Sequence, residues 1–235
     1  MTDMDKGTFI GVGVGPGDPE YLTLKALKII RENRIIAVPS GPDRLSASYR
    51  IAAKAIPELD EDVKNNRKQL LFLPMPMKRD KDELAIRHNE NAESVVEYLE
   101  AGENVVFLTL GDPNIYSTFS YLRDIVREMG YKIHTVAGVM SISAAAARLN
   151  LSLADWGESV RILPEGQMNT FDFGDDVTYV LMKPRGSLKF LRDSVKSFGK
   201  SAYAVTNCGM DNEKVYYSID EIPENLGYFT IIFVK

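Results

Sequence analysis

The sequence predicts an α/β protein made of two domains. Short apolar runs that end in Gly or Pro alternate with stretches in which apolar residues recur at helical spacing. The alternation begins at Thr8 and restarts after the segment LTLGDP at 108–113. It implies a mainly parallel sheet with helices on both faces. We expect an N-terminal α/β domain over residues 1–114, and a more mixed α/β domain over residues 115–235, where strands crowd towards the C-terminus.

The expected strands are short, rich in β-branched residues and bounded by turn residues. In chain order they are TFIGVGV, RIIAVP, QLLFLPMP, NVVFLTL, KIHTV, SVRILP, VTYVLM, SAYAVTN, KVYYSI and YFTIIFV. The expected helices carry one apolar stripe each. Their stripes are Leu22, Ala26, Ile29 and Ile30; Val95, Val96 and Leu99; Ile115, Phe119, Leu122, Val126 and Met129; the small-residue run SISAAAARLN; and Leu188, Leu191, Val195 and Phe198.

Composition excludes several classes of protein. A hydrophobic content of 45% with 26% charged residues is typical of a globular protein rather than a disordered one. The net charge of −5 argues against nucleic acid as the main partner. One cysteine, Cys208, and two histidines predict neither a disulfide framework nor a protein-borne metal site. With no long apolar run at the start, we expect no signal peptide and no membrane span, hence a cytoplasmic protein.

The tripeptide Gly-Asp-Pro occurs twice, at 17–19 and at 111–113, each time after an expected strand and before a helical pattern. Gly allows the chain to leave the strand in an unusual conformation, Asp is a preferred N-cap, and Pro suits a first helical turn. Two turns with a purely structural role would explain this choice of residues. Ligands of open α/β sheets bind beyond the carboxyl ends of strands, so the turns are also candidates for a binding site.

The first turn is rich in glycine, but it does not fit a phosphate site. The dinucleotide fingerprint requires Gly at its sixth position, where this chain has Pro16 or Asp18, depending on the frame. No Gly-Lys-Ser/Thr follows either turn. Asp18 and Asp112 would also repel phosphate at the helix N-termini where it normally binds. A ligand without phosphates suits these turns better.

The segments GVGVGPGDPEYLTLKAL and LTLGDPNIYSTFSYL resemble the two signatures of the tetrapyrrole methylases, which use S-adenosylmethionine in sirohaem and cobalamin biosynthesis. The continuation YSTF at 116–119, the block VAGVMSISAAAARLNLSLADWGESVRILP and the terminal YFTIIFV are similar to the branch that methylates C20 of precorrin-2 or cobalt-precorrin-2. Relatives usually read Pro-Gly-Ile-Thr-Ser where this chain has Ala137-Gly138-Val139-Met140-Ser141. The resemblance implies the family's fold, with two α/β domains, an active site in the cleft between them, and usually a homodimer.

The resemblance also implies where the ligands bind. The first domain would hold the tetrapyrrole and the second would hold S-adenosylmethionine, largely through backbone groups. The implied cofactor residues are Pro16, Gly111, Asp112, Ile115, Tyr116, Ser117, Thr118, Ser141, Ile142 and Met182. Tyr116 could equally be a core residue, because its helix is amphipathic.

Gly15 and Gly17 would face the tetrapyrrole. Methyl transfer gains most from aligning the methyl carbon with its nucleophile, and it needs neither a metal nor a covalent nucleophile. A carboxylate, Asp18 or Asp112, could take the displaced proton. The substrate's carboxylates would require local cations, for which the best placed are Lys183 and Arg185, after an expected strand. Further candidates are Lys25, Lys28, Lys78 and Arg79.

Other functions stay open at this point. The chain could methylate another macrocycle carbon, or a protein or RNA target, although an RNA target would favour a basic surface. A non-catalytic module that senses a tetrapyrrole or nucleoside is a third possibility. The sequence does not distinguish a substrate with cobalt from one without it.

Overall fold

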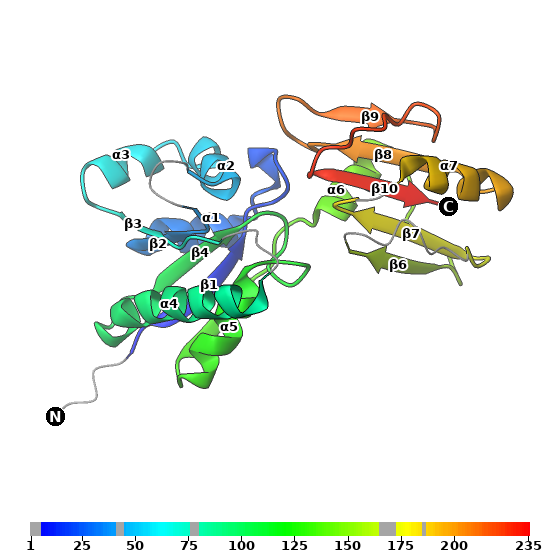
Figure 1. Cartoon of the computed structure of the whole chain (residues 1–235). Coiled ribbons are helices and arrows are strands. Elements are labelled where there is room, and N and C mark those ends of the chain that lie inside the picture. The colour runs from blue at the N-terminus through cyan, green and yellow to red at the C-terminus, as the bar shows by residue number, and fades with distance from the viewer. Residues whose placement is uncertain (1–5, 41–44, 76–79, 165–172, 185–186) are drawn as a thin grey trace. The chain divides into compact units, whose positions relative to one another are not determined.

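A computed structural model describes residues 6–40, 45–75, 80–164, 173–184 and 187–235. The chain divides into two compact units, Met1–Val139 and Met140–Lys235. We expected a boundary near residue 114. The division falls later because β5 (Lys132–Val136) pairs with β1 (Thr8–Gly13) and so belongs to the first unit's sheet. The two α/β units confirm the predicted fold class (Figure 1).

The first unit is a parallel sheet of five strands in the order β3-β2-β4-β1-β5. Its other elements are η1 (Pro19–Tyr21), α1 (Leu24–Glu32), β2 (Ile35–Val38), α2 (Ala47–Ala55), α3 (Leu59–Lys64), β3 (Gln69–Phe72), α4 (Lys81–Glu100), β4 (Val105–Thr109) and α5 (Phe119–Glu128). Helices α2 and α3 were not among the predicted elements. The parallel sheet itself was predicted correctly.

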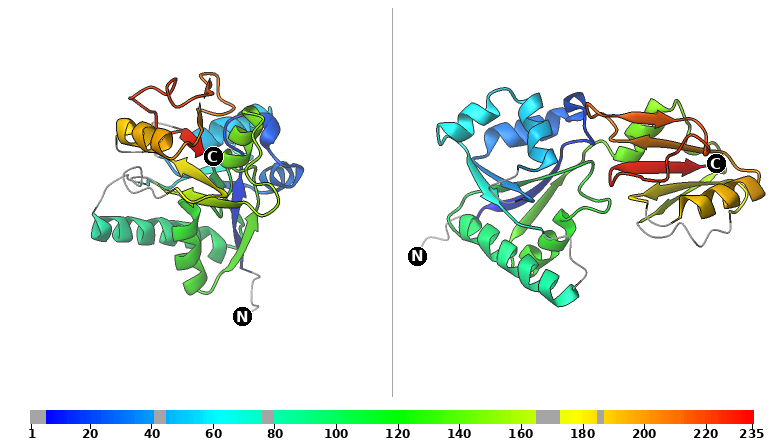
Figure 2. Two further views of the ribbon diagram at one scale, coloured as in Figure 1. Left: turned by 90° about the vertical axis from the view of Figure 1, so that its right-hand side faces the viewer. Right: turned by 45° about the horizontal axis from the view of Figure 1, so that its top comes forward.

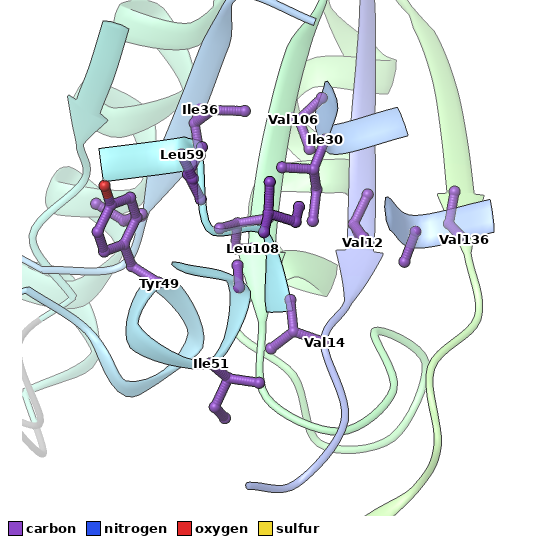
Figure 3. Packing of buried hydrophobic residues seen from close by; sticks show 14 of the residues in the cluster. Val12, Val14, Ile30, Ile36, Tyr49, Ile51, Leu59, Val106, Leu108 and Val136 are labelled. Atoms are coloured by element: carbon purple, nitrogen blue, oxygen red, sulfur yellow. The ribbon is translucent and has the colours of Figure 1, made fainter. Parts of the chain in front are cut away.

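Strand residues of the first unit alternate between two cores, as the two-residue period of a strand requires. Val12, Ile36 and Val106 face a core with α1, α2 and α3, to which Ile30 and Leu59 contribute (Figure 3). Their strand neighbours face the opposite core, with α4 and α5; these include Phe9, Ile35, Val105 and Phe107. Both faces of the sheet are therefore covered, which explains why its strands are apolar throughout.

The second unit has a mixed sheet in the order β6-β7-β10-β8-β9. Only β6 and β7 pair in parallel; the other pairs are antiparallel. Its elements are α6 (Ser141–Arg148), β6 (Ser159–Leu163), β7 (Val177–Met182), α7 (Leu188–Ser197), β8 (Ala202–Thr206), β9 (Lys214–Tyr216) and β10 (Thr230–Val234). Helix α7 packs its apolar stripe on one core of this sheet, and α6 contacts β8 and β10 (Figure 2). The mixed character predicted for the C-terminal part is confirmed.

Candidate functional site

The two Gly-Asp-Pro turns lie side by side in the first unit, because they follow the paired strands β1 and β4. The Val14 N–H donates to Thr109 O at 3.0 Å. Beyond it, the Gly111 N–H donates to Gly15 O at 2.8 Å, and the Gly15 N–H returns to Gly111 O at 3.4 Å. Backbone hydrogen bonds thus continue past the strands and hold the two turns together at the carboxyl edge of the sheet.

Glycine is required where the ends of β1, β4 and β5 meet. A Cβ atom at Gly13 would lie 2.4 Å from Gly111 O, and one at Gly138 would lie 2.2 Å from the same oxygen. Gly15 and Gly111 have φ values of 78° and 66°, in the left-handed region that glycine adopts without strain. The three strand ends therefore pack backbone against backbone, in space that a side chain would otherwise fill.

Asp18 caps the short helix η1. Its Oδ1 accepts the Glu20 N–H at 2.8 Å, as the N-cap interpretation predicts, and Pro19 occupies the first helical position. Among the described residues, Oδ2 of Asp18 has no hydrogen-bond partner, and the side chain is half-buried. One carboxylate oxygen therefore remains available to a ligand.

Asp112 is used differently. Its Oδ1 accepts both the backbone N–H and the side-chain amide of Asn114, at 2.8 and 2.9 Å, and Oδ2 accepts the Gly138 N–H at 2.9 Å. The carboxylate is buried, and both its oxygens are occupied. The expected N-cap role at this turn is wrong, because helix α5 begins only at Phe119, after Thr118.

The segment between Asp112 and α5 is an extended turn. Tyr116 adopts φ 47° and is 49% exposed, so it is not a core residue. Ser117 is buried, with its Oγ 2.9 Å from Thr109 Oγ1, and it also accepts the Phe119 N–H. Hydrogen bonds inside the first unit thus fix this segment, while Ile115 and Thr118 remain half-buried.

The remaining predicted site residues lie in the second unit. Ser141 and Ile142 begin α6, whose N-cap position, Met140, makes no side-chain cap. Ile142 is buried and Ser141 half-buried. Met182 ends β7 opposite Ile231 of β10. The structure thus brings the predicted residues of the first unit together, and it places those of the second unit at two positions, the start of α6 and the end of β7.

The predicted cations are only partly described. Lys183 follows β7 with φ 53°, and its Nζ lies 5.0 Å from the centroid of the Tyr228 ring. Lys28 lies 3.8 Å from Glu32 in an exposed ion pair, and Lys25 is exposed. The other candidates, Lys78, Arg79 and Arg185, lie outside the described residues.

Three features of the site were not predicted from the sequence. The first is the junction of Gly13 and Gly138 with Gly111, although a glycine at or just beyond the end of each strand was a signal. The others are the Thr109–Ser117 pair and Tyr228, since side-chain contacts of this kind leave no periodic pattern in the sequence. Across the described part of the chain, no group of three or more His, Cys, Asp or Glu could hold a metal ion. No helix there is long and apolar enough to cross a membrane.

The family model described as Tetrapyrrole (Corrin/Porphyrin) Methylases matches residues 8–223 of this chain. The chain belongs to the tetrapyrrole methylase family. It is 40% identical over 177 residues to a probable cobalt-precorrin-2 C(20)-methyltransferase of Methanocaldococcus jannaschii, covering 74% of this chain and 71% of the relative. It is 27% identical over 248 residues to a precorrin-2 C(20)-methyltransferase of a Sinorhizobium species, covering 100% of this chain and 97% of the relative.

Solved structures of tetrapyrrole methylases share the fold. A cobalt precorrin-4 methyltransferase superposes with a TM-score of 0.66 at 18% identity, covering 97% of this chain and 94% of that one. A uroporphyrin-III-C-methyltransferase from Thermus thermophilus gives a TM-score of 0.64 at 19% identity, covering 97% and 91%. At these identities the likeness establishes the fold, and the family assignment rests on the sequence matches.

Proposed function

We propose that the chain is an S-adenosylmethionine-dependent methyltransferase that methylates C20 of precorrin-2 or cobalt-precorrin-2 in cobalamin biosynthesis. The observation that carries the proposal is the similarity to the Methanocaldococcus relative, which extends over 74% of this chain at 40% identity. The Sinorhizobium relative, matched over the full chain, is named for methylation of the same carbon, C20, of precorrin-2.

The strand-end turns fit a cofactor without phosphates. Gly13 and Gly138 let the ends of β1, β4 and β5 pack backbone against backbone around Gly111 O, which fixes the backbone groups that a ligand at this edge would contact. Asp18 caps η1 where a phosphate would otherwise be favoured. When bound, S-adenosylmethionine supplies an electrophilic methyl group. Gly111, Asp112 and the run 115–118 would hold it from the first unit, together with Pro16, and Ser141, Ile142 and Met182 from the second.

The protein itself must align the two reactants and remove the displaced proton. Alignment of reactants is worth several kcal/mol of barrier, and it requires a rigid site. The hydrogen bonds of Asp112 and Ser117 supply that rigidity in the turn after β4. Asp18 is the better candidate for accepting the displaced proton, because its Oδ2 has no partner among the described residues, whereas both oxygens of Asp112 are occupied. Gly15 and Gly17 would face the macrocycle.

A second candidate function is methylation of another carbon of a tetrapyrrole. The chain is also 28% identical over 232 residues to a probable cobalt-precorrin-7 C(5)-methyltransferase, which it covers to 94%. A protein target is the more distant variant of the same idea. The higher identity to the C20 enzyme favours C20 as the position.

Anaerobic incubation with S-adenosylmethionine and precorrin-2, with and without cobalt, tests the proposal. We expect one added methyl group by mass spectrometry, mapped to C20 by NMR, and a preference for one metal form. A methyl at another carbon would support the second candidate. Tight binding of S-adenosylhomocysteine without methyl transfer to either form would retain the cofactor and refute the substrate.

We further propose a homodimer that works in the cytoplasm, as the family resemblance implies. Light scattering after size-exclusion chromatography measures the mass directly. A mass near that of one 26.3 kDa chain at micromolar concentration would refute the dimer.

A further inference from the structure

Three strand ends of the second unit meet at one edge of its sheet (Figure 1). Strand β10 runs antiparallel to both β7 and β8, so its first residues lie beside their last ones. The Lys183 N–H donates to Thr230 O at 3.3 Å, and the Asn207 N–H donates to Phe229 O at 2.8 Å. This edge, which we call the β7–β8 edge, therefore carries Lys183, Asn207, Tyr228 and Phe229.

Two residues at the β7–β8 edge have a left-handed backbone conformation. Lys183 and Asn207 each adopt φ 53°, in the left-handed region. For lysine this conformation costs roughly 1 kcal/mol or more, whereas asparagine adopts it readily. The backbone strain at this edge therefore lies at Lys183, at the end of β7.

The side chains at the edge form an aromatic surface with one cation above it. The rings of Tyr228 and Phe229 pack edge to face, 5.1 Å apart, and are 38% and 41% exposed. Lys183 Nζ lies 5.0 Å from the Tyr228 ring centroid, within the range of a cation–π contact. Among the residues that the structure describes, no carboxylate lies within ion-pair distance of this ammonium group. The ring therefore orients the charge without neutralising it.

We propose that Lys183 binds a carboxylate of the macrocycle and that Tyr228 is a positioning residue that holds the Lys183 ammonium group in place. This proposal rests on the proposed function and adds a substrate subsite to it. The cofactor is the weaker candidate for this cation, because its one carboxylate is accompanied by an ammonium and a sulfonium group, which leave it with a net positive charge. A chain with a net charge of −5 needs oriented cations to hold a polycarboxylate. The exposed Phe229 ring also offers an apolar surface to the edge of the macrocycle.

The test measures binding of uroporphyrin III, a polycarboxylate tetrapyrrole, by fluorescence quenching in the presence of S-adenosylhomocysteine. The variants are Tyr228→Leu, Tyr228→Phe, Lys183→Met and the double variant Tyr228→Leu/Lys183→Met. A cation–π contact of this kind predicts that Tyr228→Leu weakens porphyrin binding roughly three- to fivefold, while Tyr228→Phe, which keeps the ring, stays within about twofold of wild type. The double variant should bind no more weakly than Lys183→Met alone, because Tyr228 acts through Lys183.

Two readouts separate positioning from a structural effect. The Kd of S-adenosylhomocysteine should be the same in all four variants. In turnover, the KM for precorrin-2 should rise more than kcat changes in the three variants that lose the Tyr228 ring or the Lys183 ammonium group, and it should stay near the wild-type value in Tyr228→Phe. The proposal is overturned if Tyr228→Leu weakens porphyrin binding by the same factor in the Lys183→Met background. It is also overturned if the variants weaken the binding of S-adenosylhomocysteine as much as they weaken the binding of porphyrin.

The outcomes also separate this subsite from the proposed function. If the variants behave as expected in porphyrin binding but the wild type does not methylate precorrin-2, the function fails and the subsite stands. If the wild type methylates C20 and all variants keep its KM and porphyrin affinity, the subsite fails and the function stands.

Discussion

The Asp112 carboxylate accepts the Gly138 N–H through Oδ2 at 2.9 Å, and so ties the turn after β4 to the loop after β5. Its other oxygen accepts two hydrogen bonds from Asn114. The carboxylate of Asp18, the other aspartate of a Gly-Asp-Pro turn, accepts a single hydrogen bond among the described residues, from the Glu20 N–H. Two identical tripeptides thus place their carboxylates in different roles, one in holding loops together and one with an oxygen available.

Replacing Asp112 by Asn should loosen the turn after β4. An amide can keep the bond from the Asn114 N–H, but then it presents an N–H group to the Gly138 N–H, and donor faces donor. Hydrogen bonds to a charged group contribute about 1.5–3 kcal/mol to stability, so we expect the free energy of unfolding to fall by about that amount. We also expect weaker S-adenosylhomocysteine binding, because the loosened turn must be ordered again when the ligand binds. Isothermal titration calorimetry measures this loss. Unchanged affinity and unchanged kcat would contradict the positioning role.

Replacing Asp18 by Asn should leave the fold intact and reduce turnover. Asn is as good an N-cap as Asp, so the bond from the Glu20 N–H survives, and the melting temperature should change little. Loss of a proton acceptor typically costs about 10²- to 10⁴-fold in rate, and we expect kcat to fall at the lower end of that range. Asp18→Ala is the matched control, since it removes the cap as well and should cost about 1 kcal/mol of stability. If Asp18→Asn keeps wild-type kcat, Asp18 is not the base.

Much of the fold was predictable because its information is local. Buried parallel strands carry β-branched residues on both faces, which the runs around Ile36 and Val106 show without any structure. Helix α2 was missed because two of its four buried residues, Ser48 and Ala52, are small or polar, so that only Tyr49 and Ile51 mark an apolar stripe in the sequence. The division after Val139 was missed because it depends on the pairing of β5 with β1, and such pairing leaves no mark in either segment alone.

The site was predictable in its residues more than in their roles. The Gly-Asp-Pro repeats drew attention to Asp18 and Asp112, but the hydrogen bond to Gly138 joins residues 26 positions apart. Tyr228 carried no local signal beside Lys183, because the two are neighbours only through the β7–β10 pairing. Roles that depend on such non-local contacts needed the coordinates.

Adding one methyl group where Gly13, Gly111 and Gly138 meet should strongly destabilise the protein. In Gly138→Ala the new Cβ atom would lie 2.2 Å from Gly111 O and 2.8 Å from Gly13 Cα, and these backbone atoms can move only if the strand ends separate. Overpacking of this kind typically costs about 1–3 kcal/mol, and we expect the upper part of that range. Gly157→Ala is the matched control, because a Cβ atom there meets nothing within 4 Å. Urea unfolding should separate the two variants clearly, and equal midpoints would contradict the tight junction.

The stability of the second unit should fall at acid pH, because Glu213 contributes to it only while ionised. Burial raises the pKa of this carboxyl, but hydrogen bonds from the Gly209 N–H and from Arg148 outweigh burial and hold the pKa below its usual value. A carboxyl with a lowered pKa in the folded state stabilises the protein above its unfolded pKa and loses that contribution as the pH falls through the folded pKa.

Glu213→Gln should therefore reduce the free energy of unfolding at neutral pH, by up to about 1 kcal/mol after solvent screening, and the difference from wild type should shrink between about pH 5 and pH 3. The control is Glu93→Gln on α4, an exposed residue for which the described residues offer no hydrogen bond or ion pair. Urea unfolding at several pH values provides the measurement. A difference between Glu213→Gln and wild type that stays constant down to about pH 3 would show that packing, and not the charge of Glu213, stabilises the turn after β8.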